Sequence, residues 1–271
     1  MHRPRRPRDR RGWGRACEAP DDESSPRRHH GVGPGTRPAP SVGSDHREES
    51  RAPMTLTMTL VRHGRTHFNA RRILQGRCDS PLTRDGRAGV RVTARCLADT
   101  PFTAAWSSPS GRAVATAVEL LRHHEGVPLR TDRGLLEYAF GIYEQKPESV
   151  LDEVVAWPDL VTDVLAGRHP GLPGGEHARD FMDRTRDVFA RIAAQHDDGH
   201  VLVVGHGLTL GAYLATVDDV GLVPLPNASV STVEVDADGT TRITSIAVDV
   251  AQQGHTAARP MRTPTPVPSV A

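Results

Sequence analysis

Hydrophobic and polar positions follow two periods along this chain, and the shorter period predicts a set of strands. "TLTMTLV" at 55–61 alternates Thr with Leu and Met, and "AAWSS" at 104–108 is a short apolar run. "HVLVVGHG" at 200–207 contains a continuous apolar run bounded by glycine, which is typical of a strand covered on both faces. Alternating Val or Ile at 230–235 and 241–248, on either side of "DADG", predicts a hairpin.

The longer period predicts helices between these strands. Helical spacing covers 84–98, 148–166 and 208–216. Strands that alternate with helices imply βαβ units, so we expect an α/β fold, a three-layer α/β/α sandwich with a mainly parallel central sheet. In two further predicted helices the apolar faces are formed by Val114, Ala117, Val118 and Leu121 and by Phe181, Thr185, Val188 and Ile192. In the 148–166 segment the apolar face is formed by Val150, Leu151, Val154 and Val155.

Both ends of the chain have a different composition from the middle. Residues 1–53 are rich in Arg, Pro, Gly and Ser and poor in aliphatic residues, so they cannot bury enough surface to offset chain entropy. We therefore expect disordered tails at 1–53 and 251–271 and one folded domain at 54–250. A basic arm that docks on a partner is a second interpretation of the first tail, and translation beginning at Met54 or Met58 is a third.

The charge distribution argues against a nucleic-acid partner for the domain. The first 53 residues hold twelve Arg and eight acidic residues, and the whole chain has a formal net charge of +1, so the remainder has a net charge of −3. The chain contains no run of about 20 apolar residues, so we expect no membrane span. Three cysteines at irregular spacing do not suggest a disulfide framework, and a cytoplasmic location is expected. The sequence does not indicate an oligomeric state.

Two histidines follow predicted strands, and this placement points to chemistry. His63 comes after "TLV", and His206 comes after "VLVVG". In doubly wound sheets, ligands bind outside the carboxyl ends of the strands. One histidine after a strand has a structural interpretation just as readily, but two matching cases favour a site. Arg62 adjoins His63, and Arg112 lies in the first turn of a predicted helix, so two guanidinium groups and two imidazoles can form a receptor for a phosphate group.

Four segments resemble the histidine phosphatase superfamily, which has the phosphoglycerate mutase-like fold. "LVRHGRTHFN", "SSPSGRAVATA", "LLEYAFGIYE" and "VLVVGHG" occur in the order and spacing of that family, over about residues 56–248. The tripeptide R-H-G is a weak signal by itself. Its extension R-H-G-x-T-x-x-N, combined with the downstream Arg, Glu and His, is highly specific.

The resemblance implies a role for each matching residue. His63 corresponds to the nucleophile that accepts the phosphoryl group, and Glu137 corresponds to the acid that protonates the leaving alcohol. The resemblance also implies a small phosphorylated substrate and no cofactor. The residues that it places around the phosphate are Arg62, Asn69, Gln75, Arg112, His206 and Gly207.

This chemistry sets conditions on the two reacting side chains. An attacking imidazole must be neutral, which is satisfied by an ordinary histidine pKa near 6.5 and a partner on the other ring nitrogen. A bound dianion would raise the pKa of Glu137 by like charge, which suits a proton donor. The sequence shows no cluster of ligands at metal-binding spacing, so we expect no metal.

Two departures from the family pattern affect the substrate side. Gln145 stands where the family commonly has Gly, and His177 stands where Ser is common. Three functions remain open: a metal-independent phosphomonoesterase, a phosphoglycerate mutase, and a non-catalytic phospho-ligand binding module. Mutases of this family resemble each other in a longer insertion and in a segment that this chain replaces with "YAFGIYEQKPESV", which favours the phosphatase. Retention of the whole residue set argues against the binding module.

Overall fold

The computed structural model describes residues 55–218 and 223–252. The tail predicted at 1–53 and all but the first two residues of the tail predicted at 251–271 lie outside the described residues. Within the described part, six strands form one sheet in the order β3-β2-β4-β1-β5-β6. The strands are β1 (Thr55–Arg62), β2 (Phe102–Ser107), β3 (Leu129–Thr131), β4 (Gly199–Gly205), β5 (Val230–Asp236) and β6 (Thr241–Val248).

The sheet is mainly parallel, as predicted. Strands β3, β2, β4 and β1 pair in parallel, whereas β5 runs antiparallel to both β1 and β6. Five strands therefore share one direction, and β5 and β6 form the predicted hairpin. The three-residue strand β3 was not expected, because a run as short as "LRT" carries no periodicity.

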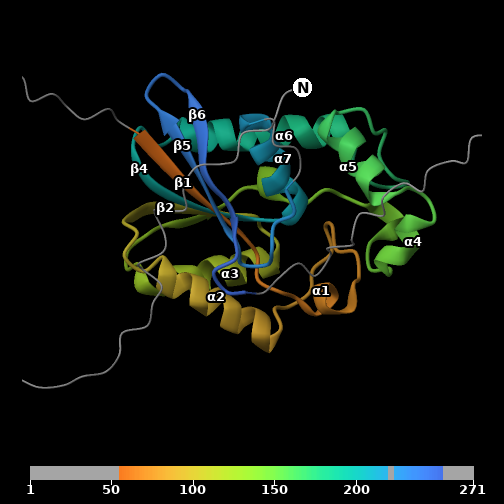
Figure 1. Ribbon diagram of the computed structural model, residues 1–271, viewed down its shortest axis with the longest axis horizontal. Coiled ribbons are helices and arrows are strands. Elements are labelled where there is room, and N and C mark those ends of the chain that lie inside the picture. Colours follow the sequence, from red (N-terminus) through yellow and green to blue (C-terminus); the bar gives the residue numbers. More distant parts are fainter. Residues whose placement is uncertain (1–54, 219–222, 253–271) are drawn as a thin grey trace, which may run out of the picture. The chain divides into compact units, whose positions relative to one another are not determined.

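Helices cover both faces of the sheet, which confirms the three-layer arrangement. Figure 1 shows α2 and α3 on one side of the strands and α6 and α7 on the other. In the described ranges, no helix has both the length and the apolar character that a bilayer span requires. The α-helices are α1 (His67–Arg71), α2 (Arg84–Cys96), α3 (Gly111–Leu120), α4 (Glu148–Asp152), α5 (Trp157–Leu165), α6 (Ala178–Ala193) and α7 (Gly207–Val217), and the short 3-10 helices are η1 (Leu121–His123), η2 (Arg133–Leu135) and η3 (Gly141–Tyr143).

The predicted apolar face of α6 is the buried face. Phe181, Thr185, Val188 and Ile192 are each 0% exposed. Val188 and Ile192 belong to a core cluster that also contains sheet residues such as Met58 and residues of α7. At about 25 cal/mol per Å² of apolar surface buried, contacts of this kind supply the main stabilisation of the layer.

The segment 148–166 forms two helices rather than a single stripe. Leu151 is buried in α4, but Val154 is 57% exposed in the connection to α5. Pro158 lies in the first turn of α5 and has no backbone N–H to donate, so a continuous helix cannot run through it. The predicted inward placement of Val154 is therefore wrong.

Strand register brings three chain segments to one edge of the sheet. Arg62 at the end of β1 pairs with Gly205 at the end of β4. Ser107 at the end of β2 pairs with Val204. The residues that follow these strands therefore emerge side by side at the carboxyl edge, where α3 and α7 begin.

Candidate active site

His63 and His206 meet at this carboxyl edge, as their positions after two strands predicted. Their ring centroids are 5.2 Å apart, and the rings are inclined at 62°. His63 is 3% exposed and His206 is 0% exposed. The backbone N–H of His63 donates to Gly205 O at 3.0 Å, which continues the β1–β4 pairing to the histidine itself.

The His63 ring is held in one orientation by its own chain. Its Nδ1 lies 2.9 Å from Gly64 O. A carbonyl oxygen only accepts, so Nδ1 carries the hydrogen of the neutral ring and Nε2 keeps its lone pair. A Cβ at Gly64 would lie 2.5 Å from Val90 Cγ2, so this glycine is needed for packing against α2.

The expectation of an ordinary pKa for the nucleophile is wrong. Burial holds the pKa of His63 well below its usual 6.5, and the positive charges of Arg112 and Arg62 lower it further. The pKa of His206 is lowered well below the usual value by burial and then by Arg112 and His63. Both rings are therefore held in the neutral form more strongly than a free imidazole.

Arg112 is fixed at the start of α3 with almost its whole side chain buried. It is 1% exposed. Nη1 donates to Cys78 O at 2.7 Å and to Asp79 Oδ1 at 3.0 Å, and Nη2 donates to Gly76 O at 2.8 Å. These bonds fix the loop at 76–79 to α3 and orient the guanidinium group.

Arg62 and Gly207 occupy neighbouring positions at the ends of β1 and β4. Arg62 Nη1 donates to Leu225 O. A Cβ at Gly207 would lie 3.5 Å from Arg62 Cζ, so the first residue of α7 touches the guanidinium plane. Burial lowers the pKa of Arg62, and the negative charge of Glu137 opposes this effect. Glu137 is therefore part of the same cluster.

The Glu137 carboxylate is bound to the N-terminus of α7. Oε1 accepts from Thr209 N and Tyr138 N, each at 3.0 Å, and lies 3.0 Å from Thr209 Oγ1. Oε2 accepts from Leu208 N at 3.0 Å. His206, the N-cap residue, makes no side-chain cap, so Glu137 takes over that function for the first N–H groups of α7.

Asn69 and Gln75 lie close together through Thr66. Asn69 Oδ1 accepts from Thr66 N at 3.1 Å in a capping box at α1, and Thr66 Oγ1 lies 3.1 Å from Gln75 Oε1. Asn227 Nδ2 donates to His63 O at 3.1 Å and to Asn69 Oδ1 at 3.4 Å. These contacts connect α1 to His63.

Three nitrogen atoms in this cluster are buried and make no hydrogen bond to the described part of the chain. They are Arg62 Nε, Arg112 Nε and His206 Nδ1. Burial of an unpaired polar atom costs about 1–3 kcal/mol, so three in one place are typical of a site built for a ligand. A tetrahedral oxyanion matches the two unpaired arginine N–H groups and their positive charge.

Two residues with contacts in the site were missed by the sequence analysis. Ser108 Oγ lies 2.8 Å from His206 Nε2 and fixes that ring. Its signal was present, because Ser108 follows a strand at the same edge as the histidines. Asn227 contacts His63 across 164 positions of sequence and lies in an irregular segment, where no periodic signal exists.

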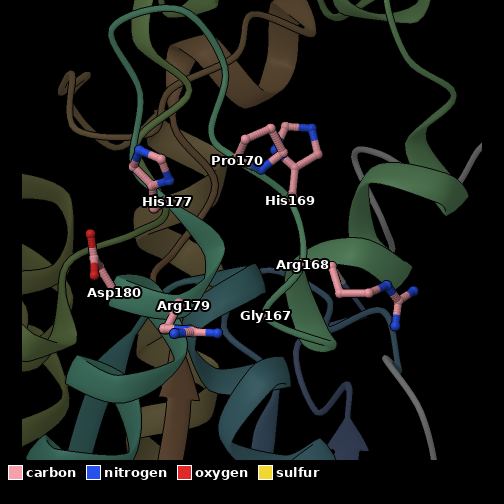
Figure 2. A pocket seen from close by; sticks show the side chains of 7 residues that line it. All are labelled: Gly167, Arg168, His169, Pro170, His177, Arg179 and Asp180. Carbon is pink, nitrogen blue, oxygen red and sulfur yellow. The ribbon is translucent and has the colours of Figure 1, made fainter.

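A separate recess of about 450 Å³ opens near the start of α6. Its lining contains none of the residues Arg62, His63, Arg112, Glu137 and His206. Figure 2 shows Arg168 turned away from the other labelled side chains. Among the described residues, no group of three or more His, Cys, Asp or Glu is arranged to hold a metal ion. The recess is lined by Gly167, Arg168, His169, Pro170, His177, Arg179 and Asp180.

Comparison with known proteins places this geometry in a family. Residues 58–247 match the profile of the histidine phosphatase superfamily (branch 1). A probable phosphoglycerate mutase, GpmB of Salmonella choleraesuis (strain SC-B67), is 32% identical over 164 residues, which is 60% of this chain and 74% of that protein. The solved structure of Bacillus stearothermophilus YhfR is 28% identical, with a TM-score of 0.62 over 72% of this chain and 99% of that one. A mycobacterial glucosyl-3-phosphoglycerate phosphatase shares the fold at 23% identity, with a TM-score of 0.61 over 72% of this chain and 99% of that one. The chain belongs to the histidine phosphatase superfamily, with the phosphoglycerate mutase-like α/β fold.

Proposed function

We propose that the protein is a phosphomonoesterase that hydrolyses a small phosphorylated metabolite through a phosphohistidine intermediate. Family membership supports an enzyme of the phosphatase or mutase type. The observation that carries the proposal is the neutral, oriented His63 ring in one cluster with the buried His206 ring and the buried, unpaired N–H donors of Arg62 and Arg112. That arrangement provides a nucleophile and a receptor for the transferring phosphoryl group. A cytoplasmic location and independence of metals stay predictions.

In the first step, the Nε2 lone pair of His63 attacks phosphorus and the bond from phosphorus to the ester oxygen breaks. The leaving oxygen takes a proton from Glu137, because an alkoxide is a poor leaving group. Oε1 of Glu137 accepts from the N–H groups of Tyr138 and Thr209, whereas Oε2 accepts only from Leu208 N, so Oε2 has room for that proton. The phosphoryl oxygens stay negative throughout, and Arg62 and Arg112 stabilise them electrostatically.

In the second step, water attacks the phosphohistidine. The Glu137 carboxylate, now ionised, takes a proton from the water, and the bond from phosphorus to Nε2 breaks. Inorganic phosphate leaves, and His63 returns to its neutral form with the hydrogen on Nδ1. The same glutamate thus serves as acid and then as base.

A mutase is the second candidate, since a relative at 32% identity is named a probable phosphoglycerate mutase. A mutase must return the phosphoryl group to a second hydroxyl of the substrate instead of to water. The segment after Glu137 supports hydrolysis, because the three-residue 3-10 helix η3 (Gly141–Tyr143) follows it directly in place of a long insertion. A non-catalytic binding module is a third candidate, which the complete residue set disfavours.

The test compares two histidine variants on p-nitrophenyl phosphate at mildly acidic pH. His63→Ala is expected to abolish hydrolysis, whereas His123→Ala, an exposed histidine on η1, is expected to leave it unchanged. Near wild-type activity of His63→Ala would remove that residue from the nucleophile role. With 3-phosphoglycerate as substrate, release of phosphate identifies a phosphatase, and formation of 2-phosphoglycerate without phosphate release identifies a mutase. A panel of phosphorylated metabolites ranked by kcat/KM then identifies the substrate.

A further inference from the structure

Arg184 uses its whole guanidinium group next to the segment that carries Glu137. It lies in the middle of α6, and its side chain is 19% exposed. Nη1 donates to Gly134 O at 2.8 Å and to Leu136 O at 2.7 Å, and Nη2 donates to Glu137 O at 3.1 Å. Three carbonyl groups of the four-residue stretch 134–137 therefore accept from one side chain.

The remaining donors of Arg184 bind Glu176, which holds the other side of the same segment. Nε donates to Oε1 at 2.6 Å, and Nη2 donates to Oε2 at 2.8 Å. Burial raises the pKa of Glu176, but the hydrogen bonds and charges of Arg184 and Arg77 outweigh burial and lower it overall. Glu176 Oε1 also accepts from Arg77 Nη2 at 3.0 Å, in the loop that binds Arg112. The Arg184–Glu176 pair thus connects residues 134–137 to the loop at 76–79 that binds Arg112.

The geometry points to Arg184 as a positioning residue for Glu137, and this assignment rests on the proposed function. The carboxyl end of Glu137 is fixed by the N-terminus of α7, and its backbone is fixed by Arg184 on α6. Leu136 O also accepts from Thr209 Oγ1 at 2.8 Å, so both helices hold the residue that precedes the acid. Proton transfer to a leaving group depends on the placement of the donor to a fraction of an ångström.

A purely structural role for Arg184 makes a different prediction from a positioning role. A structural role lowers the fraction or the stability of folded protein and affects all substrates equally. A positioning role affects the step that needs the proton, so esters with poor leaving groups lose more rate than esters with good ones. The leaving-group dependence of kcat/KM therefore separates the two roles.

The experiment compares Arg184→Met with Arg186→Met in the full chain. Arg186 lies on the same helix, is exposed and pairs with Asp183, so it is the matched control. For Arg184→Met we expect kcat/KM on an alkyl phosphate to fall about 100-fold and on p-nitrophenyl phosphate to fall less than about 5-fold. Arg184→Lys keeps the charge but offers one nitrogen instead of three, and about a 10-fold selective loss is expected.

Equal losses on both substrates, or no loss in folded Arg184→Met protein, would overturn the assignment while leaving the proposed function intact. If Arg184→Met does not fold, Arg184→Lys provides the same comparison. The proposed function is monitored separately by phosphorylation of His63 in the wild-type protein. Absence of that adduct would overturn both, so the two failures can be told apart.

Discussion

Replacement of Arg112 by lysine tests the receptor for the phosphoryl group without removing its charge. The arginine fork reaches Gly76 O through Nη2 and Cys78 O through Nη1, and both bonds are 2.8 Å or shorter. A lysine ammonium is a single nitrogen on a shorter reach, so it cannot serve both carbonyls in the arginine geometry. Arg112→Lys therefore leaves at least one buried carbonyl group of the loop at 76–79 unpaired.

The size of both effects follows from these contacts. One unpaired buried carbonyl costs about 1–3 kcal/mol of the free energy of unfolding. At about 2–4 °C per kcal/mol for a domain of this size, Tm should fall by about 2–12 °C. Loss of the oriented Nε and fork should lower kcat/KM by about 100- to 1000-fold, the usual cost of removing one preorganised donor to developing charge.

Urea unfolding gives the free energy, and initial rates on p-nitrophenyl phosphate give kcat/KM under conditions where the variant is fully folded. Arg95→Lys, an exposed position on α2, is the control and should match the wild type in both measurements. Folded Arg112→Lys with kcat/KM within about threefold of the wild type would refute the reasoning, because a free charge would then serve as well as a positioned fork.

Three further changes have expected outcomes. Glu137→Gln should slow hydrolysis of an alkyl phosphate at least about 100-fold more than that of p-nitrophenyl phosphate; an equal loss on both would argue against proton donation. Because the pKa values of His63 and His206 lie well below 6.5, the unfolded chain binds protons between that pH and the folded-state pKa while the folded chain does not. The free energy of unfolding, measured by urea titration, should therefore fall as the pH is lowered from 7 to 5. The loss of kcat/KM on the acid side of its pH profile should occur below pH 6.5. A larger free energy of unfolding at pH 5 than at pH 7 would contradict the expected direction. Gln145 has a φ of 64°, a left-handed conformation that favours glycine. Gln145→Gly should therefore raise the free energy of unfolding by up to about 1 kcal/mol. A marked decrease in the same urea titration would count against backbone strain at this position.

Strand ends were predictable because they depend on local pattern and on a general rule for parallel sheets. The apolar runs before His63 and His206 are visible in the sequence, and parallel strands deliver their carboxyl ends to one edge. The buried face of α6 was predictable for the same reason, as Phe181 and Val188 demonstrate, but Val118, predicted on the apolar face of α3, is 59% exposed. The break before α5 could have been predicted from Pro158, which the apolar period alone does not take into account.

Contacts between distant segments could not be predicted. Arg184 is one of many arginines in the chain, and its partners at 134, 136 and 137 lie almost 50 positions away. The pKa of His63 depends on its burial and on Arg112, which only the folded chain brings near. Sequence position thus predicted which groups lie together at the carboxyl edge, while their protonation and support follow from packing.

The most direct measurement of the central claim is rapid-quench labelling with a phosphate ester that carries a radioactive phosphoryl group. The account predicts an adduct that is acid-labile and alkali-stable, that forms and decays at rates compatible with turnover, and that maps to His63 by peptide analysis. His63→Ala should show no such adduct, whereas His123→Ala should label like the wild type. Turnover of the wild-type protein without any adduct on His63 would contradict the account.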